Sequence, residues 1–349
     1  MAHMIDMTGN RANMAYVGET PWHGLGTVLQ PGASLETWTQ AAGLGWTALK
    51  LPSYYEIPAR YEGAKPGETD MVKSKDKFHI VRDDTYESLG VMSEGYHVVQ
   101  PKDVLDFFQH FILTDDRFQL ETAGSLKAGR VIWALAKFQE AMDCAGDEHV
   151  PYVLLTTSYN GSLATTAQAT MIRVVCNNTL TAAVYAKSNR AVVKVAHSTR
   201  WTPEVVAHAH DQLASITGDF AVYRRLAEAL AGVRMAKSQT EDFLKRLSFP
   251  KGETEASAAQ KSQYDALFRA WAVTATETEG NTAWAALNGV TRFVDHDRNT
   301  RMKGGVTHKA QAQMSSAFFG TGAALKAQAL GALAESGKID LKALATVDA

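Results

Sequence analysis

The 349-residue sequence has few cysteines and no long apolar segment. Its two cysteines, Cys144 and Cys176, are too few for a disulfide framework or a cysteine-ligated metal cluster, and they suit a reducing compartment. No apolar run approaches the roughly 20 residues that span a bilayer. The first residues also lack the basic start and apolar core of a signal peptide. These absences predict a soluble, cytoplasmic protein without membrane contact.

The sequence also lacks the short motifs that mark common catalytic and nucleotide-binding sites. It has no phosphate-binding P-loop, no glycine fingerprint for a dinucleotide, no nucleophile elbow and no CxxC pair. We therefore expect no cofactor, and we assign no catalytic residue and no metal ligand. These absences make an enzyme less expected without excluding one.

A third absence is local, because residues 149–203 contain no aspartate or glutamate. Over the whole chain, 37 acidic residues nearly balance 35 lysines and arginines, so several acids would be expected in a stretch of this length. A phosphate backbone is attracted by spaced cations and repelled by carboxylates, so the pattern predicts a polyanion-binding surface. The alternative is a solvated face whose acids lie elsewhere in space. The cations of this acid-free segment are Arg173, Lys187, Arg190, Lys194 and Arg200.

Other residues of the acid-free segment and of the hairpin before it suggest how that surface is completed. Tyr185 and Trp201 are aromatic residues that can stack on bases. Lys127 and Arg130 extend the surface from the preceding hairpin. Cys176 would be a nucleophile if a base were nearby, but a cysteine at the end of an apolar strand is usually a small core residue.

Hydrophobic periodicity divides the chain into a β-rich first half and a helical second half. Alternating patterns predict a hairpin over Phe118–Phe138 that turns near Lys127–Gly129, and a second hairpin that turns at Asn160–Gly161. Helical spacing dominates after Thr202, which is expected to cap a helix with Pro203 in its first turn. We therefore predict an α+β fold, in which a central antiparallel β-hairpin sheet is flanked by helices and followed by a helical C-terminal half.

Two local patterns add predictions to this outline. Residues 61–77 are polar and rich in turn formers, which predicts an exposed loop. Asn178 precedes a helical pattern and is expected to cap that helix. The predicted divisions of the chain are a loop-rich N-terminal segment, a sheet core domain and a helical C-terminal region, over residues 1–60, 61–201 and 202–349.

Five segments occur along the chain in this order: TPWHGLGTVL, ETAGSLKAGRVIWALAKF, TSYNGSLA, IRVVCNNTL and NTAWAALNGVTRFVDH. Together they resemble an uncharacterised phage/plasmid-like protein family, whose members occur in phage genomes, conjugative plasmids and transferred chromosomal regions. The resemblance covers most of the chain and implies no established activity. The family often has a His–Asp pair before the glycine of the second hairpin, where this chain has Tyr159 and Asn160. No ionisable catalytic pair is therefore expected at that turn.

The architecture is also similar, more weakly, to phage single-strand annealing proteins of the Erf and Red-beta kind, which form rings or filaments and hold DNA in a basic groove. With the acid-free segment, this predicts a single-stranded DNA-binding and annealing protein of a phage or plasmid, active in recombination or DNA repair. The expected partners are single-stranded DNA and further copies of the chain, in a ring or filament in the bacterial host cytosol.

Two other functions are alternatives. A metal-dependent nuclease or other hydrolase would use His23, Cys176 or the cluster Asp295–His296–Asp297. Consecutive helical residues point in different directions, however, so this cluster is a poor set of metal ligands. The second alternative is an anti-defence protein that blocks a host factor by protein–protein contact.

Overall fold

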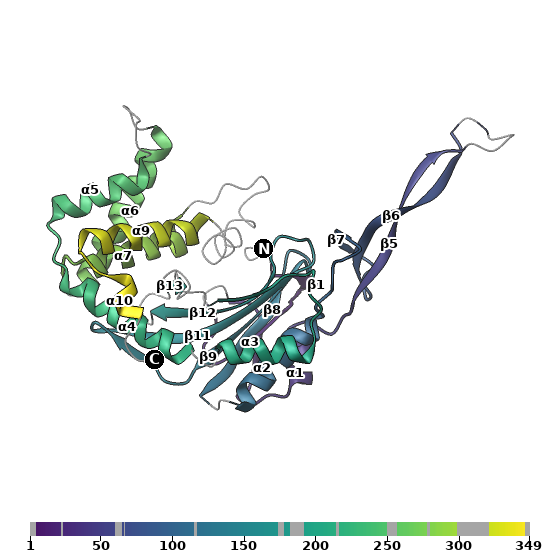
Figure 1. Cartoon of the computed structure of the whole chain (residues 1–349), viewed down its shortest axis with the longest axis horizontal. Helices are drawn as coiled ribbons and strands as arrows, with labels where there is room; N and C mark the ends of the chain where they lie inside the picture. Colours follow the sequence, from purple (N-terminus) through teal and green to yellow (C-terminus); the bar gives the residue numbers. More distant parts are fainter. Residues whose placement is uncertain are drawn as a thin grey trace.

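The structure is a computed structural model, and it describes residues 5–21, 24–59, 65, 67–114, 117–173, 178–181, 192–213, 216–249, 257–277, 280–298 and 321–345. A large sheet forms the centre of the molecule (Figure 1). Helices from the C-terminal half gather at one end of this sheet, and a narrow β-ribbon projects from the other end. The predicted α+β class with a helical second half is confirmed.

The main sheet has nine strands in the described part of the chain, with the central order β13-β12-β11-β9-β8-β3-β4. Its strand pairs are antiparallel, except that β3 and β4 run parallel. β13 and β14 share one edge of β12, and β10 pairs with β11. The strands are β3 (Met14–Val17), β4 (Thr27–Leu29), β8 (Phe118–Leu126), β9 (Val131–Phe138), β10 (Met142–Cys144), β11 (Asp147–Ser158), β12 (Thr165–Arg173), β13 (Asn178–Thr181) and β14 (Val192–Val195).

Both predicted hairpins are present. The turn between β8 and β9 has a positive φ of 57° at Lys127 and at Ala128, and it ends with Gly129. In the turn between β11 and β12, the Asn160 side chain accepts a hydrogen bond of 3.1 Å from the backbone N–H of Ser162. Gly161 follows with a φ of 71°, a conformation that glycine adopts readily. Local turn chemistry therefore fixes both hairpins.

Both faces of the main sheet are covered, which explains the nearly continuous burial of β9 and β11. On one face lies α2 (Pro101–Thr114), whose Val104, Phe107 and Phe108 are buried, and α1 (Leu35–Ala41) and α3 (Pro203–Leu213) lie beside it (Figure 1). On the other face, Trp133 and Tyr152 belong to a second cluster of buried apolar residues. The small strands β1 (Met7–Thr8) and β2 (Arg11–Ala12) form a separate pair.

The helical part is built around α7, in which every residue from Ala283 to Thr291 is buried. A Cβ at Gly289 would lie 2.6 Å from Trp271 Cα, so this glycine lets α7 approach α6 closely. At the entry to this half, Val205 N–H donates to Thr202 Oγ1 over 3.4 Å, as expected for the predicted cap of α3. The elements are α4 (Ile216–Gly232), α5 (Lys237–Ser248), α6 (Ala258–Glu277), α7 (Ala283–Arg292), the π-helix η2 (Phe293–Asp297), α9 (Thr321–Ser336) and α10 (Leu341–Ala345).

A separate three-stranded sheet contains the projecting ribbon. It consists of β5 (Ala48–Pro58), β6 (Thr69–Arg82) and β7 (Ser88–Ser93), in that order. The predicted loop over residues 61–77 is wrong from Thr69 onward, because those residues belong to β6. Both faces of the ribbon contact solvent here, so this strand needs no hydrophobic alternation. Its turn-forming residues therefore suggest a loop where the chain forms a strand.

The prediction for Asn178 is also wrong. Asn178 begins β13, where it pairs with Arg173 of β12, and it caps no helix. The open edge of β12 offers backbone hydrogen bonds to residues 178–181, and this tertiary pairing overrides the local helical pattern.

Candidate nucleic-acid interface

The acid-free segment includes both buried and exposed parts. Residues 149–158 belong to β11 in the middle of the main sheet, and β12 lies beside it. Only β13, β14 and the loop after β14 lie at the edge. Lys194 is exposed on β14, opposite Thr166 of β12. Arg200 is exposed on the loop that connects β14 to α3. Neither cation has an ion-pair partner within the described residues. Tyr185, Lys187 and Arg190 lie outside the described residues.

Several predicted residues meet at one end of the main sheet, here called the turn end. The turn end contains residues 127–130, residues 159–164 and the loop after β14. The Tyr159 N–H donates to the Arg130 carbonyl over 2.9 Å, which joins the first two segments. A ring nitrogen of His197 lies 3.1 Å from the Leu163 carbonyl oxygen, which joins the third. The fold thus brings Lys127, Arg130 and the Lys194–Arg200 region to one end of the molecule.

Arg130 itself makes structural contacts. Its Nε donates to the Leu89 carbonyl over 3.2 Å, which ties the first hairpin to β7. Its guanidinium also lies 3.7 Å from the Glu87 carboxylate. Since its side chain is 40% exposed, Arg130 keeps access to solvent, but part of its charge is offset.

Trp201 and Arg173 are placed differently. Trp201 is half-buried, and its ring centroid lies 6.1 Å from that of Phe107 of α2, so packing accounts for at least part of its role. Arg173 ends β12 seven residues beyond Thr166, roughly 23 Å along the strand at about 3.3 Å per residue. The fold therefore separates Arg173 from Lys194 and Arg200.

His197 holds the acid-free segment against the ribbon's sheet. Its Nδ1 lies 3.2 Å from the His97 carbonyl oxygen, and the His97 N–H donates to the His197 carbonyl over 2.6 Å. Its ring stacks on Tyr96, whose hydroxyl donates to the Ser158 carbonyl over 2.6 Å. Burial lowers the pKa of the His197 imidazole, although the two carbonyl contacts act to raise it. The neutral ring that burial favours has one N–H, so it donates to only one of the two carbonyls at a time.

The opposite end of the main sheet carries a buried polar seam with the helical part. Trp284 of α7 donates from Nε1 to Asp147 Oδ2 over 2.9 Å, and the Tyr223 hydroxyl lies 3.0 Å from His149 Nδ1. All four side chains are buried. His149 pairs with Arg173 on β12, so the seam joins the segments IRVVCNNTL and NTAWAALNGVTRFVDH, which are distant in sequence.

The groups considered for catalysis receive little geometric support. Asp295 Oδ1 accepts from Lys326 Nζ over 2.6 Å, and both side chains are buried, whereas His296 and Asp297 are exposed. No cluster of three metal-ligating side chains occurs among the described residues. Burial raises the pKa of the Cys144 thiol to about 12, which makes it unreactive. His23 and Cys176 lie outside the described residues.

Comparison with protein families shows which family the chain belongs to. The model of a domain of unknown function, DUF932, matches residues 88–317. The chain belongs to the DUF932 family. The match begins at the first residue of β7 and extends beyond α7, so it includes both ends of the main sheet but not strands β5 and β6 of the ribbon. No curated protein and no solved structure matches the chain. No helix in the described ranges is both long and apolar enough to cross a membrane.

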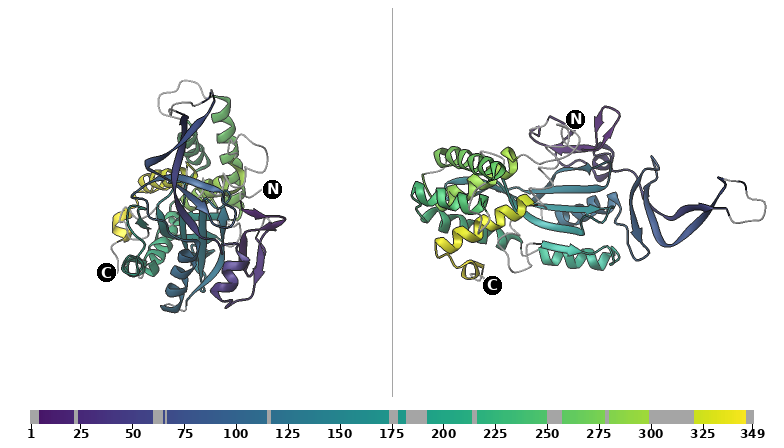
Figure 2. Two further views of the ribbon diagram at one scale, coloured as in Figure 1. Left: turned by 90° about the vertical axis from the view of Figure 1, so that its right-hand side faces the viewer. Right: turned by 90° about the horizontal axis from the view of Figure 1, so that it is seen from above.

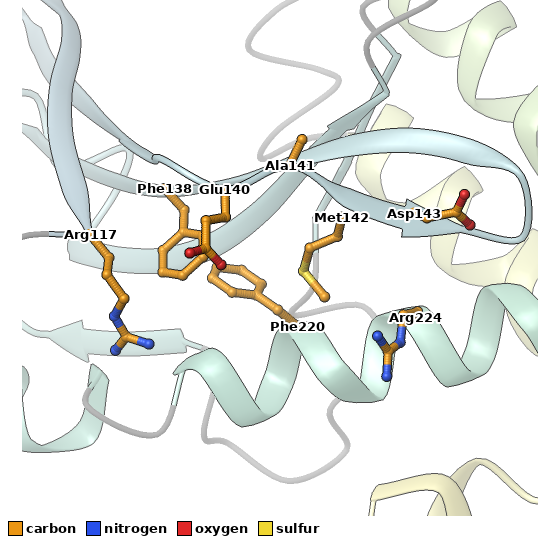
Figure 3. Close-up of a pocket in the computed structure, with 8 residues that line it drawn as sticks. All are labelled: Arg117, Phe138, Glu140, Ala141, Met142, Asp143, Phe220 and Arg224. Carbon is orange, nitrogen blue, oxygen red and sulfur yellow. The ribbon is translucent and has the colours of Figure 1, made fainter.

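One pocket of about 350 Å³ lies within the DUF932 match, at the end of β9 (Figure 3). Arg117 and Arg224 line it together with Glu140 and Asp143, so its charges are mixed. The guanidinium of Arg117 lies 5.3 Å from the Phe138 ring centre, which indicates a packing role. The mixed charges of the pocket match no single class of ligand, and we assign no chemistry to it.

Sequence reasoning missed the exposed aromatic and basic residues of the ribbon, which lies outside the DUF932 match. Tyr54 of β5 and Met71 of β6 are 51% and 61% exposed. The lysines of β6 at positions 73, 75 and 77 are exposed as well. Residues 69–75 read TDMVKSK, which shows no hydrophobic alternation, so the sequence carries little signal for this strand.

Proposed function

We propose that the protein binds single-stranded DNA and anneals complementary strands, as part of phage or plasmid recombination or DNA repair. The observation that supports this most is the acid-free stretch of residues 149–203, in which Lys194 is exposed on the edge strand β14 and Arg200 is exposed on the loop after it. Neither cation has an ion-pair partner among the described residues, so both can attract a phosphate backbone. The phage/plasmid-like family resemblance is consistent with this role.

The proposed mechanism is electrostatic and needs no cofactor. Each lysine or arginine that contacts a phosphate displaces condensed counterions, so affinity falls steeply with rising salt. Aromatic residues near the cations then stack on bases without reading their sequence. Such a surface holds one strand in an extended form and leaves its base edges accessible to a complementary strand.

We further propose that the protein acts as a homo-oligomer in the bacterial host cytosol. The described part of the acid-free segment presents two exposed cations per copy, Lys194 and Arg200, and single contacts of this kind are weak. Adjacent copies in a ring or filament would hold one strand at many sites, and the effective concentration of each next site would raise the overall affinity.

Charge-matched variants test the proposed DNA surface. The first variant is Lys194→Ala with Arg200→Ala, and the control is Lys245→Ala with Lys261→Ala on the exposed faces of α5 and α6. Fluorescence anisotropy with a labelled oligonucleotide should show weaker binding for the first variant and unchanged binding for the control. Equal binding by both variants and the unmodified protein would reject these residues as the site.

The mass and the nucleic-acid content of the purified protein distinguish this function from the two alternatives. The proposed function predicts a large assembly that retains nucleic acid, seen as a raised ratio of absorbance at 260 nm to that at 280 nm and a mass well above one chain. Cleavage of labelled DNA with a divalent metal would instead favour a nuclease. A stoichiometric host protein without nucleic acid would favour an anti-defence protein.

A further inference from the structure

The distal part of the ribbon extends beyond the body of the molecule. Both Figure 1 and the right-hand view of Figure 2 show β5 and β6 projecting together from the main sheet. β7 pairs with β6 only over Lys77–Val81, so Thr69–Lys73 pair with β5 alone. The outer edge of β6 is therefore unpaired over these residues, and exposed side chains from both strands line the ribbon.

The two faces carry different side chains. Directly opposed residues of an antiparallel pair share a face, and Tyr54 opposes Lys73 while Glu56 opposes Met71. Lys75 lies just beyond the paired stretch, where the register between β5 and β6 shifts. The exposure of β6 alternates as far as Lys75, which favours the same face for that lysine. We call this the lysine face. Its members are Tyr54, Glu56, Met71, Lys73 and Lys75.

The opposite face is more apolar. Tyr55 opposes Val72, and Ile57 opposes Asp70. Ile57, Asp70 and Val72 are each half-buried, but Tyr55 is 54% exposed, so this face also carries an accessible aromatic ring. The two faces therefore differ mainly in their lysines.

The chemistry of the lysine face fits single-stranded nucleic acid. It offers an aromatic ring that is 51% exposed, beside two ammonium groups. Neither Lys73 nor Lys75 has a carboxylate at ion-pair distance among the described residues. Cations that contact phosphates and an aromatic ring that stacks on a base are the two components of sequence-tolerant binding to single strands. Glu56 is the one acid on this face, so cations outnumber acids there.

One edge of the ribbon is poorly suited to strand addition by a second copy. β5 is an edge strand, and its prolines at positions 52 and 58 lack the N–H that a new strand would need. A proline within a sheet stands where its nitrogen faces away from the paired strand, so both prolines interrupt the outer edge of β5. Strand addition is therefore disfavoured along the edge of β5, whereas the outer edge of β6 over Thr69–Lys73 carries no proline.

The base of the ribbon adjoins the acid-free segment. Lys50 of β5 donates from Nζ to the Tyr96 carbonyl over 3.0 Å, and Tyr96 stacks on His197. His197 lies between Lys194 and Arg200 in the sequence. A single strand of nucleic acid bound to Lys194 and Arg200 would therefore pass close to the base of the ribbon.

We propose that the lysine face of the ribbon is a second contact for single-stranded nucleic acid, which continues the surface that begins at Lys194 and Arg200. This inference rests on the proposed DNA-binding function. It assigns binding to a part of the chain outside the DUF932 match, on an observation independent of the acid-free segment.

The test uses the full-length protein and a fluorescent 40-nucleotide single strand. The lysine-face variant is Tyr54→Ala, Lys73→Ala and Lys75→Ala, and the control on the opposite face is Tyr55→Ala with Ser74→Ala. A charge control is Lys245→Ala with Lys261→Ala. The lysine-face variant should bind about tenfold more weakly or worse, because a stacked base and two phosphate contacts are lost. Its slope of log affinity against log salt should fall by roughly 1.4, and both controls should match the unmodified protein.

Each of the following outcomes would contradict the inference, and each points to a different cause. If the lysine-face variant binds normally while Lys194→Ala with Arg200→Ala weakens binding, the inference is wrong and the proposed function stands. If the unmodified protein binds no nucleic acid, both fail together. If the variant keeps its affinity but its assembly mass falls, the ribbon contacts a second copy and not nucleic acid. Equal losses in the lysine-face variant and the opposite-face control would also reject the assignment of the face.

Discussion

The ring of Tyr96 stacks on the ring of His197, with their centroids 4.5 Å apart and their planes inclined by 23°. Tyr96 follows the last strand of the ribbon's sheet, and His197 follows β14 of the main sheet. This contact, with the hydrogen bond from His97 N–H to the His197 carbonyl, holds the ribbon against the acid-free segment. The orientation of one proposed binding element relative to the other therefore depends on it.

The His197 link should make stability depend on pH. The unfolded imidazole titrates near its ordinary pKa of 6.5, and burial lowers the pKa in the folded protein. The folded state thus binds fewer protons, so the contribution of this ring is present above about pH 6.5 and is lost as pH falls below that value. Urea unfolding of the protein and of His197→Gln between pH 8 and pH 5 measures the effect. The variant should lose less stability on acidification, and identical pH slopes would contradict the prediction.

The Tyr96 hydroxyl should contribute measurably to stability. It donates to the Ser158 carbonyl over 2.6 Å in a buried position, so Tyr96→Phe leaves that carbonyl without this donor. The expected loss is about 1–3 kcal/mol of unfolding free energy. Tyr86→Phe is the matched control, because Tyr86 is 77% exposed and should tolerate the change. Chemical denaturation compares the two, and equal stabilities would show that the buried hydrogen bond contributes nothing.

Gly90 of β7 should tolerate no side chain. A Cβ there would lie 2.5 Å from the Tyr159 carbonyl oxygen and 2.8 Å from Asn160 Cα, both backbone atoms. Gly90→Ala must therefore push β7 away from the second hairpin, at an expected loss of about 1–3 kcal/mol. Gly331→Ala is the control, since Gly331 is an exposed residue of α9 with open space around it. That change should be neutral or should stabilise the helix, by about 0.5–1 kcal/mol. Thermal unfolding of both variants measures these two changes in stability.

Removing one member of the buried pair of Asp295 and Lys326 should cost more stability than replacing both members by apolar residues. Lys326 is 1% exposed, and its Nζ lies 2.6 Å from Asp295 Oδ1. Lys326→Met alone removes this cation from a buried carboxylate, which should cost about 3–5 kcal/mol. The double variant Asp295→Leu with Lys326→Met should recover most of that stability. A double variant no more stable than either single variant would show that the pair itself is required.

The sequence predicts the local structure well where turn chemistry determines it. Asn160–Gly161 and Lys127–Gly129 form the turns that their residues favour, and Thr202 caps α3 as expected. Such features depend on a few neighbouring residues, which is why they can be predicted without the rest of the chain.

Features that depend on distant partners are not predictable in this way. Asn178 joins a strand because β12 has a free edge beside it, and nothing within its own segment indicates this pairing. The ribbon is hidden for a different reason, since its polar, turn-rich residues need no buried face. The separation of Arg173 from Arg200 also appears only in the structure, because sequence proximity suggests one continuous patch.

The salt dependence of DNA binding tests the central claim most directly. The affinity of the unmodified protein for a single-stranded oligonucleotide is compared over a range of salt with that of a variant carrying Lys187→Ala, Arg190→Ala, Lys194→Ala and Arg200→Ala. If all four residues contact phosphates, the variant should bind more weakly and its slope of log affinity against log salt should fall by about 2.8, at about 0.7 per phosphate contact. An unchanged affinity and an unchanged slope would show that the acid-free segment does not bind DNA.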